Sequence, residues 1–464
     1  MGEPEVPPRR LRNPTRRGNV EGAVSRFRVA LAGAAVLTAA VVGTARSAEP
    51  LPPLVLEAPT PTPLLGFAPA GGYEQALVRL DPQTLARSGR HFVVTGDHTF
   101  GWSFSPDRSR LVLGGQSGTL LLVDVKKLRP LGYVDTGVYK LVQATQWVGR
   151  RRVVAAVADC CGLAPTSLVA VDPVKRKVVA RHRVGGSLQR SVGVPNGLVL
   201  LLGPTVGVGP SRLAVMGPRA TVRTVALDRI LSGQGRGTEA SPIVAYSSPA
   251  LVTDPDGRTA YVIASGSEAA AINLRTLAVT YHSLSRPVSL LGRLDRWLEA
   301  PAQAKGAPDG PTRNAIWLGN GILALYGADD HGSVGADGVP RLTSTPAGLQ
   351  LVNTRDWSVR MLDADADTAA VAQDALLATG SSWHSDTQTQ TGSGLTIFGA
   401  DGAVRAHLFG SRALWLETVG ARAFVPFAPP DIGYDVVDVR SGAIVATIRD
   451  RELPTVLASQ ALPR

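Results

Sequence analysis

Carboxylates and imidazoles that could bind a metal ion stand in two polar segments of the second half of the chain. They are Asp329, Asp330 and His331 in the segment 327–346, and His384 and Asp386 in the segment 381–394. Oxygen and imidazole ligands together suit several divalent metals, so one interpretation is a metal site that the two segments share. The other is that these residues belong to solvated polar loops, and the sequence leaves both open.

A third group of carboxylates has the spacing of a calcium loop. Asp363, Asp365 and Asp367 alternate along the chain, and Asp374 stands at the twelfth position of the same segment. The sixth position is Thr368, where the EF-hand turn uses glycine, and no flanking helices are predicted. Calcium is therefore the one ion whose spacing pattern the sequence shows in part, and no other cofactor is predicted.

The only two cysteines, Cys160 and Cys161, are adjacent. In an oxidising compartment they could form a strained vicinal disulfide with each other, or each could bridge elsewhere. They could hold zinc only with ligands from distant loops.

The elements that must position these residues are short strands in a repeated hairpin. Each copy has an apolar strand, a turn that opens on Asp or Asn, and a second apolar strand, and copies recur roughly every 40–55 residues. Short Asp and Asn side chains hydrogen-bond the turn backbone, which suits this position. The clear copies are centred on Asp81, Asp124, Asp172, Asn273, Asn353 and Asp438, and two degenerate copies on Gly217 and Asp401.

A second strand pair precedes many of these hairpins, as in the segments 100–114, 250–264, 314–326 and 412–424. Two hairpins per repeat give four strands, which is the period of a propeller blade. We therefore expect an all-β fold: a single seven- to eight-bladed β-propeller of four-stranded blades over residues 65–464. A C-terminal strand near 455–458 would complete the first blade and close the ring.

Two of the strand pairs resemble a known repeat family. Phe104–Asp107 (FSPD) is followed by LVLGG and LLLVD, and Thr253–Gly257 (TDPDG) is followed by AYVIA. These motifs resemble the bacterial YVTN/WD40-like propeller repeats, and the resemblance covers residues 65–460. It implies a propeller of a kind often found outside the cytoplasm, and it does not specify a function.

The longest connections in the predicted propeller fall on one face of the ring. The segments 158–166, 327–346, 381–394 and 426–433 each join the second and third strands of a blade, and they are polar. Binding residues concentrate in loops that a rigid scaffold holds, so this face is the predicted binding face. Its candidate residues are Cys160, Cys161, Asp330, His331, Trp383, His384 and Asp431.

The sequence has no GxSxG, HExxH, CxxC or P-loop motif, and its seven histidines are scattered. We therefore predict a non-catalytic binding or scaffold module, monomeric, for a protein, peptide or envelope component. The alternative is a propeller hydrolase, lactonase or lyase with a metal-assisted site at the central channel. The net charge of +11 is not gathered in a basic cluster, so no nucleic-acid partner is predicted.

The N-terminal region predicts export. Residues 1–28 are rich in arginine, residues 29–45 (VALAGAAVLTAAVVGTA) are apolar and should be helical, and residues 46–64 form a proline-rich linker. The apolar segment is either the core of a cleaved signal peptide or a membrane anchor, and both place the propeller outside the cytoplasm. A further amphipathic helix is predicted over residues 286–300.

Overall fold

The computed structural model describes residues 52–457, apart from 72–73, 95–100, 160–163, 237–242, 265–267, 285–309, 335–336, 338, 413–414 and 429. The chain divides into Met1–Pro50 and Leu51–Arg464, and the described residues belong to the second unit. The apolar segment 29–45 and the helix predicted over 286–300 lie outside the described residues. Every regular element that is described is a β-strand, and none of this part of the chain forms a helix that could span a membrane.

The strands assemble into four-stranded antiparallel arrays, which we number in chain order. Array one is β34 (Thr455–Val456), β1 (Leu65–Gly71), β2 (Glu74–Leu80) and β3 (Arg87–Val94). Array two is β4 (Trp102–Phe104), β5 (Arg110–Gly114), β6 (Thr119–Asp124) and β7 (Arg129–Asp135). Array three is β8 (Leu141–Val148), β9 (Arg152–Ala158), β10 (Thr166–Asp172) and β11 (Lys177–Val184).

Array four is β12 (Ser187–Val194), β13 (Gly197–Gly203), β14 (Gly207–Met216) and β15 (Val222–Arg236), with β16 (Ile243–Ser247) paired to the end of β15. Array five is β17 (Ala250–Thr253), β18 (Thr259–Ile263), β19 (Glu268–Asn273) and β20 (Val279–Ser283).

Arrays six and seven share one nine-stranded sheet, because β23 (Pro340–Pro346) pairs with both β22 and β27. Array six is β21 (Gly310–Trp317), β22 (Ile322–Val334), β24 (Leu349–Asn353) and β25 (Val359–Asp363). Array seven is β26 (Thr368–Ala372), β27 (Ala375–His384), β28 (Thr389–Phe398) and β29 (Val404–Leu408). Array eight is β30 (Glu417–Val419), β31 (Arg422–Pro426), β32 (Gly433–Asp438) and β33 (Ala443–Arg449).

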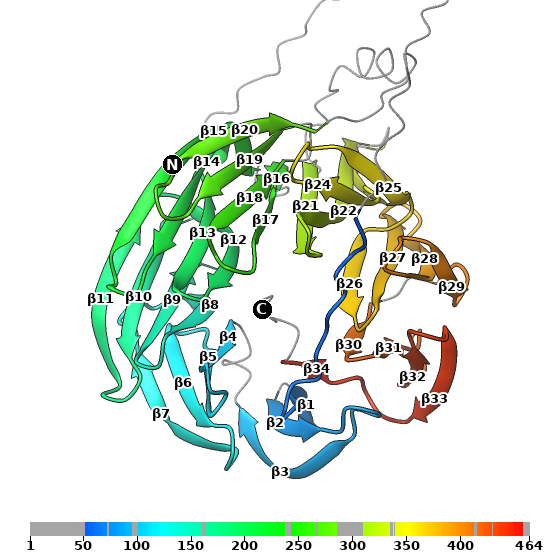
Figure 1. The fold of residues 1–464 in the computed structure, drawn as a ribbon, viewed down its shortest axis with the longest axis horizontal. Coiled ribbons are helices and arrows are strands. Elements are labelled where there is room, and N and C mark those ends of the chain that lie inside the picture. Colours follow the sequence, from blue (N-terminus) through cyan, green and yellow to red (C-terminus); the bar gives the residue numbers. More distant parts are fainter. Residues whose placement is uncertain are drawn as a thin grey trace, which may run out of the picture. The chain divides into compact units, whose positions relative to one another are not determined.

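Within residues 51–464 the arrays follow one another around a common centre, each with its first strand innermost (Figure 1). The two ends of the described chain close the ring, as predicted. Gly66 and Phe67 of β1 pair with Val456 and Thr455 of β34, and the Leu457 N–H donates to the Leu65 carbonyl at 2.9 Å. This is the arrangement of a β-propeller.

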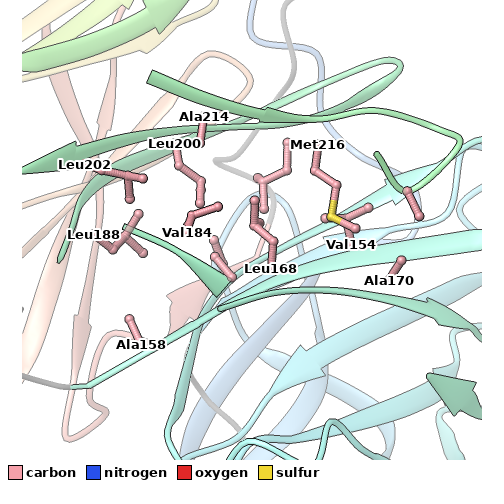
Figure 2. Packing of buried hydrophobic residues seen from close by; sticks show 14 of the residues in the cluster. Val154, Ala158, Leu168, Ala170, Val184, Leu188, Leu200, Leu202, Ala214 and Met216 are labelled. Atoms are coloured by element: carbon pink, nitrogen blue, oxygen red, sulfur yellow. The ribbon is translucent and has the colours of Figure 1, made fainter. Parts of the chain in front are cut away.

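Both faces of each sheet are buried between neighbouring arrays. Along β9, for example, Val153, Ala155 and Val157 pack against array two, while the alternating Val154 and Ala156 pack against array four. A strand alternates its side chains between two faces, so a strand buried on both sides reads as a continuous apolar run. Figure 2 shows the packing between arrays three and four, including Val154, Leu168, Leu200 and Met216.

The repeated Asp or Asn residues form the turns between the third and fourth strands, as predicted. Asp172 Oδ1, for instance, accepts hydrogen bonds from the Val174 and Lys175 backbone N–H groups, both at 2.9 Å. The left-handed residue in these turns is the one four positions later. Such residues include Leu85, Leu128, Arg176, Leu277 and Trp357, with φ between 47° and 61°.

Part of the expected proline-rich linker packs on the ring. Leu54 and Leu56 are buried at 5% exposure in the cluster between arrays six and seven. The Leu54 N–H donates to the Ala400 carbonyl, and the Leu56 carbonyl accepts from the Asp374 N–H. This portion of the linker lies against turns of the propeller instead of acting as a free spacer.

The closing strand contacts a partly buried carboxyl group. Glu417 on β30 accepts a hydrogen bond from the Val456 backbone N–H on β34. Burial raises the pKa of Glu417 to about 7, and this hydrogen bond opposes the shift only in part. The Glu417 carboxyl group is therefore partly protonated near neutral pH.

We predict that Glu417 makes the folded ring less stable as the pH rises from about 4.5 to about 7. The folded state holds a proton there that the unfolded chain has already released, so the contribution to the slope is at most about 1.4 kcal/mol per pH unit. Glu417→Gln should lose this part of the slope in urea unfolding measured across that range. The control is Glu452→Gln, which changes an exposed carboxylate shortly before β34 and should keep the wild-type slope. Equal slopes in the wild type and both variants would contradict the prediction.

Candidate functional site

The radial order of strands gives the ring two different faces. The loop face carries the connections between second and third strands and those between arrays. The turn face carries the turns between first and second strands and between third and fourth strands. The segments 327–346, 381–394 and 426–433 lie on the loop face, as predicted, whereas Cys160 and Cys161 lie outside the described residues.

Two of the segments expected to be irregular loops are strands. β22 continues to Val334 and pairs with β23, and β27 continues to His384 and pairs with β28 as far as Thr389. β23 also pairs with β27, through Thr343 with His384 and Ser344 with Trp383. These segments therefore form one continuous extension of the sheet, which explains why arrays six and seven are joined.

Similar extensions come from arrays four and six. The start of β14 pairs with the end of β15, and β15 pairs with β16. Ser248, directly after β16, forms a parallel bridge to Thr312 of β21. We call these extensions together the strand platform: residues 207–210, 231–236, 243–248, 310–312, 327–334, 340–346, 381–384 and 389–392. Its residues belong to arrays four, six and seven and lie on the loop face.

The strand register sorts the predicted site residues onto two surfaces of the platform. His331, Thr343 and His384 are register partners in one row across β22, β23 and β27. The Thr343 hydroxyl lies 3.4 Å from His384 Nδ1. Asp330, Ser344 and Trp383 form the next row, so their side chains project from the opposite surface.

Asp329 and Asp330 are bound to other side chains of the platform. Asp329 Oδ1 forms an ion pair with Arg313 of β21 at 2.8 Å, and Asp330 Oδ2 accepts a hydrogen bond from the Tyr246 hydroxyl. Arg313 is only 4% exposed, and it also donates to the Thr312 and Ala328 carbonyls, both at 3.0 Å. The two carboxylates therefore connect β22 to β21 and to β16.

The remaining predicted ligands lie apart from these. Asp386 accepts from the Thr387 N–H in the turn after β27, and Asp431 is exposed between β31 and β32. Among the described residues, no group of three or more His, Cys, Asp or Glu side chains is placed to hold a metal ion.

The four aspartates with calcium-loop spacing are also separated. Asp363 and Asp365 line a cavity of about 540 Å³ at arrays six and seven, whereas Asp367 Oδ2 accepts from the Ser381 N–H and hydroxyl. Asp374 lies at a turn on the opposite face and forms an ion pair with Arg440 at 3.0 Å.

The sequence did not point to a partly buried arginine near the centre of the ring. Arg190 on β12, the innermost strand of array four, donates to the Arg313 carbonyl of array six at 3.3 Å. Burial lowers the pKa of Arg190, and the nearby Tyr326 hydroxyl opposes that shift, while burial raises the pKa of Tyr326. Arg190 and Tyr326 lie far apart in sequence, so only the fold brings them together.

The Arg313–Asp329 ion pair generates a stability prediction. Asp329→Ala leaves the buried Arg313 guanidinium without its counter-charge and should lower the free energy of unfolding by about 2–3 kcal/mol. The matched control is Asp337→Ala, which removes an exposed ion pair with Arg341 at the tip of the same hairpin and should cost less than about 1 kcal/mol. Urea unfolding of both variants measures the difference, and equal losses would show that Arg313 does not depend on Asp329.

Comparisons with known proteins bear on the fold only. No protein-family model matches the sequence, and no curated protein matches it either. Among solved structures, the chain is similar to the dihydro-heme d1 dehydrogenase NirN in complex with DHE, with a TM-score of 0.55 and 13% identity over 89% of this chain and 79% of that chain. It also matches BamB from Moraxella catarrhalis, with a TM-score of 0.43 and 12% identity over 80% of this chain and 93% of that one. The β-propeller domain of Cps50 (Swd1) from Myceliophteria thermophila matches with a TM-score of 0.39 and 11% identity, over 72% and 96% of the respective chains.

Proposed function

We propose that this chain is an extracytoplasmic, monomeric, eight-bladed β-propeller that binds a partner protein on its loop face without catalysing a reaction. Each four-stranded array is one blade. Residues 29–45 export the chain or anchor it in the membrane. The partner lies across the strand platform and the neighbouring connections.

The observation that carries this proposal is the exposure of large apolar side chains on the loop face. They come from connections and strand extensions of blades two, four, six, seven and eight: Tyr139, Val206, Val208, Leu231, Val339, Trp383, Trp415 and Ile432, each at least 36% exposed. Exposed apolar side chains also occur on outer strands and turns, but both of the exposed tryptophans among the described residues, Trp383 and Trp415, lie on the loop face. Tryptophan and tyrosine in particular are enriched among the residues that dominate protein–protein binding energy.

The strand platform favours a macromolecular partner. It presents the polar Ser344 beside the exposed Trp383 on the same surface, and protein interfaces contain such a mixture of polar and apolar groups. Its backbone is fixed by strand pairing and by the Arg313–Asp329 ion pair, so little ordering is needed when a partner binds.

The test is affinity capture from cell envelopes with the full chain. Trp383→Asp combined with Trp415→Asp should remove a partner that the wild-type chain enriches, with at least an about tenfold loss measured by quantitative mass spectrometry. The matched control combines Met361→Asp and Val404→Asp, which change exposed apolar residues on outer strands and should leave capture unchanged.

Metal analysis of the same preparations separates binding from catalysis. Stoichiometric metal in the wild-type chain, together with no protein whose enrichment depends on Trp383 and Trp415, would overturn the proposal in favour of the metal-assisted enzyme. Equal loss of capture in the outer-strand control would remove the assignment to the loop face.

A further inference from the structure

A large groove lies on the turn face, opposite the surface to which the sequence pointed. It has a volume of about 1080 Å³. Four turns line it: those after β12 and β14 in array four, and those after β17 and β19 in array five. Its volume is at the upper end of the range for small-molecule pockets, so it has room for a short peptide segment.

The walls of the groove are basic. Arg223, Arg258 and Arg275 line it against one carboxylate, Asp256, which lies 3.5 Å from Arg258 with both side chains well exposed. Arg223 is bound within the protein, because its guanidinium donates to the Arg275 and Leu274 carbonyls, both at 2.6 Å. Arg258 and Arg275 are exposed and can bind anionic groups of a ligand.

The floor of the groove is apolar. Val194, Val215 and Leu274 are buried beneath it, at 4–6% exposure. Pro195 and Pro255 form parts of the turns on either side. A basic wall beside an apolar floor matches a ligand that carries both carboxylates and apolar side chains.

Contacts between the two arrays fix the shape of the groove. Gly257 has a φ of +63°, and a Cβ atom there would lie 3.0 Å from Pro195 Cδ and 3.0 Å from Val194 Cβ. The turns after β12 and β17 therefore approach as closely as a glycine allows, while Arg223 ties the turns after β14 and β19 together. A preformed groove of this kind loses little entropy when it binds an extended chain.

We propose that this groove binds an acidic, apolar-containing peptide segment of a partner protein. Ligand carboxylates pair with Arg258 and Arg275, and ligand apolar side chains lie over Val194, Val215 and Leu274. Proteins that bind single-stranded nucleic acid use aromatic side chains to stack the bases, and the residues that line this groove include none. The site is separate from the loop face and does not rest on the function proposed for it.

The test uses the full chain and a fluorescently labelled peptide of about ten residues that alternates glutamate and leucine. Fluorescence anisotropy should show saturable binding that weakens with salt. Arg258→Glu combined with Arg275→Glu should weaken it about tenfold or more, since two attractive charges become repulsive. The same variant should gain affinity for a peptide that alternates lysine and leucine.

Lys126→Glu is the matched control. Lys126 stands two residues after Asp124, as Arg275 stands two residues after Asn273, and its carbonyl accepts from Arg79 as that of Arg275 accepts from Arg223. It lies in array two, away from the groove, and the variant should bind the acidic peptide like the wild type.

Three results would overturn the proposal: no saturable binding, equal weakening in Lys126→Glu, or equally tight binding of single-stranded DNA that the same two substitutions abolish. The Trp383→Asp and Trp415→Asp variant should retain peptide binding. Loss of peptide binding in that variant would place the peptide on the loop face instead. If this variant keeps peptide binding, the groove acts independently of the loop face, so failure of one proposal leaves the other standing.

Discussion

The interaction on which the structure depends is the burial of both faces of every sheet between its neighbours. A strand such as β9 is apolar on both sides, so array three is covered only when arrays two and four both pack against it. A row of such sheets would leave one apolar face uncovered at each end. Closing the row into a ring removes both ends, and the pairing of β1 with β34 performs that closure.

Arginines reinforce the apolar contacts on the turn face. Arg79 of array one donates to the Lys126 carbonyl of array two, Arg152 of array three to the Pro218 carbonyl of array four, and Arg223 of array four to the Arg275 carbonyl of array five. These bonds use backbone carbonyls that the tight turns leave unpaired. Side-chain hydrogen bonds on the turn face therefore help the apolar contacts to hold neighbouring arrays together.

The repeat and its turns could be predicted from the sequence because they depend on local chemistry. Asp172 and Asn273 cap the turn backbone as their residue types suggest, and even the degenerate copies at Gly217 and Asp401 join third and fourth strands. The left-handed residue four positions later was missed, since positions such as Leu85 and Trp357 show no preference for that conformation.

The candidate sites could be predicted less well, because they depend on pairing between distant segments. Polar composition predicted loops at 327–346 and 381–394, but each segment finds a strand partner once arrays six and seven are side by side. Arg190, Arg313 and the basic groove on the turn face are assembled from different arrays, and no local pattern relates them. The pKa of the partly buried Glu417 is likewise raised only because the two ends of the ring meet beside it.

The central claim, a ring closed by β34, is tested most directly by hydrogen–deuterium exchange on the full chain and on a chain that ends at Glu452. Removal of β34 should reduce amide protection on both sides of the seam, in β1 and β2 of array one and in β31 and β32 of array eight. The latter lie at the other end of the sequence, and they share the cluster of Leu64, Val78, Phe424, Tyr434 and Val456 with array one. Arrays three to five should keep their protection. Unchanged protection in array eight would show that the two ends of the chain do not close a ring.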